Sequence, residues 1–107
     1  MTNYLGRRKF IPVGRPHNLT MVFLGTTLIW FGWFAFNGGA AVSSNSRAAL
    51  AAFVSTLAAS MSGLSWAMYD YIYTQKLSGV AFCSGAIAGL VAITPAAGYV
   101  GILYFLF

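Results

Sequence analysis

Three long apolar runs, separated by short polar stretches, dominate the amino-acid pattern of this chain. They extend over residues 19–42, 48–73 and 79–95. A transmembrane helix needs roughly 17 to 25 predominantly apolar residues to cross the hydrocarbon core of a bilayer. Each run therefore predicts one transmembrane helix, and the pattern as a whole predicts an all-α fold, a polytopic membrane helix bundle.

The two ends of the chain differ from these three runs. Residues 1–18 contain two prolines and no apolar stretch longer than two residues, which is typical of a loop. Pro95 closes the third run, and residues 98–107 form a last apolar piece of about half a span. Because membrane helices do not normally stop inside the bilayer, we expect a truncated fourth helix at 98–107 and a chain that is a fragment of a longer protein.

Basic residues predict the orientation of the helices. Four of the six basic residues precede the first apolar run, Arg47 follows that run, and Lys76 follows the second. Cytoplasmic loops are enriched in Lys and Arg, so we expect residues 1–18 and the loop near Lys76 to be cytoplasmic and residues 43–47 to lie outside. The four basic residues of the first loop are Arg7, Arg8, Lys9 and Arg15.

Composition supports lipid as the surroundings of this chain. Of its 107 residues, 59% are hydrophobic and 7% are charged, which is far too apolar for a soluble domain. The net charge of +5 does not indicate nucleic-acid binding, because most of it lies before the first helix. We expect a multi-pass membrane protein in contact with the lipid bilayer.

Catalytic residues are too few and too scattered for an enzyme. The chain has one acidic residue, Asp70, one histidine, His17, and one cysteine, Cys83, each on a different segment. We therefore expect no enzyme activity and no cofactor. His17 is predicted to be a turn or capping residue before the first helix, and Cys83 a buried structural thiol.

Two long motifs carry a resemblance to a known family. Residues 16–19 read PHNL and lead into residues 31–39, which read FGWFAFNGG; residues 83–101 read CSGAIAGLVAITPAAGYVG. In this order, with an Ala-rich helix between them, the motifs resemble the ammonium transporter/methylammonium permease/Rhesus (Amt/Mep/Rh) family. The resemblance implies a segment covering helices six to eight and the start of helix nine of an eleven-helix channel fold.

The resemblance implies a role for two aromatic residues. In the family, residues that match Trp33 and Phe36 line the external end of the conduction path. Helical geometry agrees with this, because Trp33, Phe36, Asn37 and Ala40 fall within roughly 100° of one helix side. An indole face attracts a cation such as ammonium. Ala40 stands where the family usually has a serine that contacts ammonium, so this chain lacks that hydroxyl.

The implied function is transport of ammonium, ammonia or methylammonium through a hydrophobic channel, by a homotrimer in the plasma membrane. The two pore histidines of the family lie on helices outside this segment, and neither His17 nor Asp70 matches a pore residue. An alternative also fits the sequence: a non-conducting small membrane protein that packs with full-length homologues. Its packing surface would be the Gly- and Ala-rich faces, such as the pair Gly85 and Gly89.

Overall fold

Three long helices make up the computed structural model, which describes residues 4, 6, 16–42 and 44–100. They are α2 (Leu19–Gly39), α3 (Ser46–Thr74) and α4 (Gly79–Ile93), and α4 continues into a short 3-10 helix, η1 (Thr94–Ala96). The described part of the chain contains no strand. The prediction of an all-α fold is confirmed.

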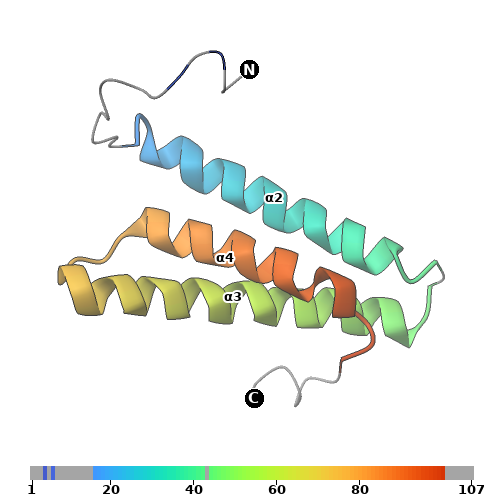
Figure 1. Ribbon diagram of the computed structural model, residues 1–107. Helices are drawn as coiled ribbons and strands as arrows, with labels where there is room; N and C mark the ends of the chain where they lie inside the picture. Colours follow the sequence, from blue (N-terminus) through green and yellow to red (C-terminus); the bar gives the residue numbers. More distant parts are fainter. Residues whose placement is uncertain (1–3, 5, 7–15, 43, 101–107) are drawn as a thin grey trace.

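The helices lie side by side in an up-down-up arrangement (Figure 1). Helices α3 and α4 run antiparallel and form the most extensive contact, while α2 packs less extensively against both. The end of α2, the start of α3 and η1 all meet at one end of the bundle, opposite the start of α2. This end is called the distal end below.

Helices α2 and α3, and α4 together with η1, are each long and apolar enough to cross a membrane. The three candidate spans are Leu19–Gly39, Ser46–Thr74 and Gly79–Ala96. They coincide with the three apolar runs of the sequence, which confirms the prediction of three transmembrane helices.

Several helix ends differ from the sequence-based bounds, and α3 runs over Ser46–Thr74 instead of 48–73. Helix α2 ends at Gly39, three residues before the expected end at Val42, and Val42 adopts a positive φ of 58° that cannot continue a helix. Helix α4 ends at Ile93 and tightens into η1, where Pro95 stands in the first turn. Of the expected partial helix, Gly98 and Tyr99 form a turn, and residues 101–107 lie outside the described residues.

Side-chain caps explain where the helices begin. The side-chain oxygen of Asn18 accepts a hydrogen bond from Met21 N, and Asn45 and Ser78 cap α3 and α4 in the same way. Such caps satisfy one of the backbone N–H groups that the first helical turn leaves without a partner. Asn18 is therefore the capping residue of α2, and His17 lies in the bend before it.

Small residues bring α3 and α4 close together. A Cβ atom at Gly89 would lie 2.5 Å from Ala58 O, and one at Gly85 would lie 2.8 Å from Ser62 O. Glycine at both positions allows the two backbones to approach. Val54, Ala58 and Ile93 form the buried cluster between the helices, and the thiol of Cys83 is buried and free, as expected.

Candidate functional site at the distal end of the bundle

The two aromatic residues singled out in the sequence lie together near the distal end of α2. The ring centroids of Trp33 and Phe36 are 5.7 Å apart, with an angle of 49° between the ring planes. Trp33 is half-buried, whereas 60% of Phe36 is exposed. Their separation of three residues places them on neighbouring turns of one helix face, so local helix geometry is enough to bring them together.

A hydrogen bond to the first residue of η1 fixes the orientation of the Trp33 indole. Trp33 Nε1 donates to Thr94 Oγ1 over 2.8 Å, and the Thr94 hydroxyl donates in turn to Leu90 O over 2.8 Å. An indole has one donor, so Trp33 uses its whole hydrogen-bonding capacity inside the protein.

Asn37 carries the polar contact between α2 and α3. Its side chain is 2% exposed, and its Nδ2 atom donates to Ser55 Oγ over 2.7 Å. The hydroxyl of Ser55 donates to Ala51 O over 2.6 Å. A polar residue buried among membrane helices normally has such partners, because an unpaired polar group there is costly.

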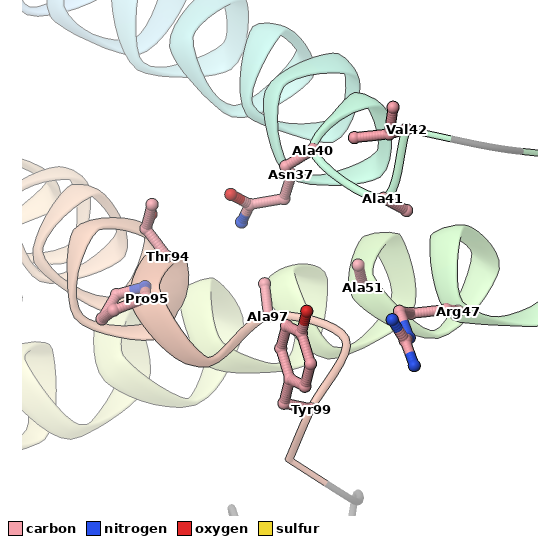
Figure 2. Close-up of a pocket in the computed structure, with 10 residues that line it drawn as sticks. All are labelled: Asn37, Ala40, Ala41, Val42, Arg47, Ala51, Thr94, Pro95, Ala97 and Tyr99. Carbon is pink, nitrogen blue, oxygen red and sulfur yellow. The ribbon is translucent and has the colours of Figure 1, made fainter.

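A pocket of about 430 Å³ opens beside these residues at the distal end (Figure 2). Asn37 lines it from α2 and Thr94 from η1, and Ala40 contributes a methyl group at the position where the family usually has a serine hydroxyl. Neither Trp33 nor Phe36 lines the pocket itself. Trp33 is nevertheless linked to it through its hydrogen bond to Thr94.

The rim of the pocket carries a positive charge. Arg47, at the start of α3, places its guanidinium carbon 5.0 Å from the centroid of the Tyr99 ring, which is within cation–π range. Gly98 adopts a φ of 82°, and a Cβ there would lie 3.0 Å from Arg47 Cγ. The turn after η1 is therefore held against the start of α3.

The sequence indicates the aromatic pair, but it does not indicate Thr94 and Ser55, which are the hydrogen-bond partners of Trp33 and Asn37. Thr94 and Ser55 lie 61 and 18 residues from their partners, and both fall in apolar runs where a hydroxyl is usually bonded to its own helix. Asn37 could be identified from the sequence, because a carboxamide inside a membrane span is a functional candidate by default. Among the residues that the structure describes, no group of three or more His, Cys, Asp or Glu side chains is placed to hold a metal ion.

Comparison with known proteins adds the decisive observation. The model of the family described as "Ammonium Transporter Family" matches residues 2–105, which is nearly the whole chain. The chain belongs to the ammonium transporter family. This confirms the resemblance that the two sequence motifs carried, and with three apolar helices it makes the chain a multi-pass membrane protein of a transporter family, not an enzyme.

Curated relatives and solved structures agree with this assignment. Ammonium transporter 2 of Schizosaccharomyces pombe is 56% identical over 99 residues, which cover 90% of this chain and 19% of that protein. The crystal structure of Saccharomyces cerevisiae Mep2 matches with a TM-score of 0.80 and 49% identity over 82% of this chain. That of Candida albicans Mep2 matches with a TM-score of 0.85 and 42% identity over 94% of this chain. These matches cover 20% and 24% of the two Mep2 chains, so this chain spans about a fifth of the length of its relatives.

Proposed function

We propose that this chain forms one wall of the external part of an ammonium conduction path, with Trp33 and Phe36 facing the permeating species. The species carried are ammonium or ammonia, and methylammonium as an analogue. The observation that carries the proposal is the pairing of the two rings, 5.7 Å apart, beside a pocket at the distal end of the bundle. Its relatives are named as ammonium transporters, which supports the same substrate.

Physical chemistry supports a recruiting role for the aromatic pair. The face of an aromatic ring carries a partial negative charge, and it attracts a cation more strongly where water is partly excluded. Trp33 is half-buried and rigidly oriented by Thr94, so its face is preorganised. Ammonium would be drawn to these rings before it loses a proton and passes further along the path.

The position of this wall in the membrane follows from the expected orientation. With residues 1–18 in the cytoplasm, the distal end lies at the external surface of the plasma membrane. In the complete fold we expect three subunits, each with its own path. Within the described residues the single histidine is His17, which precedes α2, so the paired pore histidines of the family would come from other helices of a full-length protein.

Uptake of methylammonium tests the role of the aromatic pair. Residues 16–100 of this chain would replace the matching segment of Ammonium transporter 2 of S. pombe, in cells that lack their own ammonium transporters. The chimaera should transport, and Trp33→Leu combined with Phe36→Ala should lower uptake by at least about tenfold, because a cation–π contact in a desolvated site is worth about 2 kcal/mol.

A matched substitution controls for general damage to the chimaera. Trp66 lies on α3, is 48% exposed and does not line the distal pocket, so Trp66→Leu should leave uptake at equal membrane expression unchanged. If the Trp33 and Phe36 double variant took up methylammonium as fast as the unaltered chimaera, these residues would not lie on the conduction path.

One observation bears on the alternative of a non-conducting packing protein. The glycine face formed by Gly85 and Gly89 is already occupied by α3 of the same chain, so it is not a free surface for a homologue. Only 6% of the apolar window of α2 is buried, however, and this helix leaves a large face for a protein partner. Co-purification with a full-length transporter, without ammonium flux by the chain itself, would favour the alternative.

A further inference from the structure

We propose, building on the function above, that the side-chain oxygen of Asn37 accepts a hydrogen bond from ammonium in the distal pocket, and that Ser55 is the positioning residue that turns this oxygen toward the cation. The pocket would thus keep an oxygen contact for ammonium although Ala40 provides no hydroxyl. Asn37 lines the pocket, and Figure 2 shows its amide group reaching across from α2 in the direction of Thr94.

The direction of the hydrogen bonds fixes which end of the Asn37 amide is engaged. The Ser55 hydroxyl has one hydrogen, and it is directed at Ala51 O over 2.6 Å. Ser55 Oγ is therefore an acceptor toward Asn37, and the amide must present Nδ2 to it, over 2.7 Å. The carbonyl end, Oδ1, points away from Ser55, and among the described residues no donor bonds to it.

The Asn37 oxygen is accessible from the pocket, because no buried side-chain oxygen or nitrogen among the described residues lacks a hydrogen-bond partner. The Asn37 side chain is 2% exposed, and Oδ1 has two lone pairs that favour a donor. Since Oδ1 has no partner within the protein, it is open to the pocket, and a ligand that donates to it adds a hydrogen bond that the protein alone does not make. The pocket is the space from which such a donor can reach it.

The neighbouring polar groups match a ligand that only donates. Trp33 Nε1 donates to Thr94, and the Thr94 hydroxyl donates to Leu90 O, so both of these donors are already engaged. Trp33 does not line the pocket, so the free acceptors there are Asn37 Oδ1 and a lone pair on Thr94 Oγ1. Ammonium has four N–H donors and no acceptor, so it suits two neighbouring acceptor oxygens better than an anion does.

The positive charge of Arg47 is compatible with a cation bound beside Asn37. Its guanidinium group is exposed at the rim and lies over the Tyr99 ring, so its charge is shared with an aromatic face and screened by solvent. Asn37 belongs to the buried end of the same pocket. The acceptor site and the positive rim are therefore separate parts of it.

Solution NMR of the full chain in detergent micelles tests the contact directly. With ¹⁵N labelling, the side-chain amide signal of Asn37 and the indole signal of Trp33 are followed while ammonium chloride is added at neutral pH. Potassium chloride at equal ionic strength is the control, because K⁺ is a monovalent cation without hydrogen-bond donors. We expect a saturable shift of the Asn37 signal with ammonium only. No shift, or the same shift with potassium, would overturn the inference.

Two substitutions distinguish the Asn37 oxygen, which contacts ammonium, from Ser55, which positions it. Asn37→Leu should weaken ammonium binding, followed at the Trp33 signal, by about tenfold or more, since a hydrogen bond to a charged ligand is removed. Ser55→Ala leaves Oδ1 in place but releases the amide, so binding should weaken by about threefold to tenfold. Ser60→Ala is the matched control, because the Ser60 hydroxyl bonds only to Leu57 O of its own helix.

Asn37→Asp shows whether weaker binding in Asn37→Leu comes from the lost oxygen or from a failure to fold. Its carboxylate has two acceptor oxygens and a negative charge, so it does not need Ser55 to turn one oxygen toward the pocket, and ammonium should bind at least as tightly as in the unaltered chain. Weaker binding in Asn37→Asp, or unchanged binding in Ser55→Ala, would count against the inference. If ammonium shifts the Trp33 signal but leaves Asn37 unaffected, the oxygen contact is refuted while the aromatic path stands.

Discussion

Trp33 depends on one threonine for its orientation, because Thr94 Oγ1 is the acceptor for its indole N–H. Thr94→Val keeps the shape of the side chain and removes the acceptor. Interhelical hydrogen bonds in membrane proteins contribute about 0.6 kcal/mol on average and up to about 1.7 kcal/mol, so we expect a stability loss of about 1 kcal/mol. Thermal unfolding in detergent measures it, and the Trp33 indole NMR signal should move or broaden.

Thr94→Ser is the matched variant for this hydrogen bond. It keeps the hydroxyl that accepts from Trp33 and loses only a methyl group, so the position of the indole signal should stay close to that of the unaltered chain. If Thr94→Val and Thr94→Ser gave the same indole signal, the hydrogen bond would not be what orients Trp33.

At the residue scale, the sequence predicts local neighbours and misses distant ones. Trp33 and Phe36 are three residues apart on one helix, so helix geometry alone places their rings together. The partners Thr94 and Ser55 are chosen by how α3 and α4 pack against α2, and no local pattern encodes that choice. The roles of Trp33 and Phe36 in conduction remain predictions.

At the scale of helices, the contact between α3 and α4 depends on glycine. A Cβ at Gly89 would lie 2.5 Å from the backbone oxygen of Ala58, which has no flexible end that can move aside. Gly89→Ala should therefore force the helices apart and lower stability by about 1 to 3 kcal/mol. Thermal unfolding of the purified chain in detergent measures the change.

Gly32 provides a control for the substitution itself. It lies on α2, and a Cβ built there meets no other atom within 4 Å, so Gly32→Ala should leave stability unchanged or slightly raise it. Equal effects of the two substitutions would mean that close backbone approach at Gly89 does not hold α3 and α4 together.

Helix number was predictable from the sequence, whereas helix ends were less so. A bilayer of fixed thickness demands long apolar runs, and the three runs correspond to the three spans that the structure describes. The ends depend instead on backbone detail: after Gly39 the chain turns through Ala40 and Ala41 to Val42 at a φ of 58°, and Pro95 stands in the first turn of η1, which follows α4. Hydrophobicity does not report such features.

At the scale of the whole molecule, the three helices are unequally covered. A third of the apolar window of α3 and of the third span is buried, but only 6% of that of α2. The chain also spans about a fifth of the length of its relatives. In the proposed channel, further helices of a full-length protein would cover α2 and face Trp33 and Phe36 across the conduction path.

The most direct test of a conduction path along α2 is uptake by the chimaera with Trp, Phe or Leu at position 33. The quantity to measure is the methylammonium concentration that half-saturates uptake. Attraction of a cation to the ring falls from Trp to Phe and is lost with Leu. The half-saturating concentration should therefore rise in that order, while the same series at Trp66 leaves it unchanged. Values that do not follow the order at position 33, or that change equally at both positions, would contradict a conduction path along this face of α2.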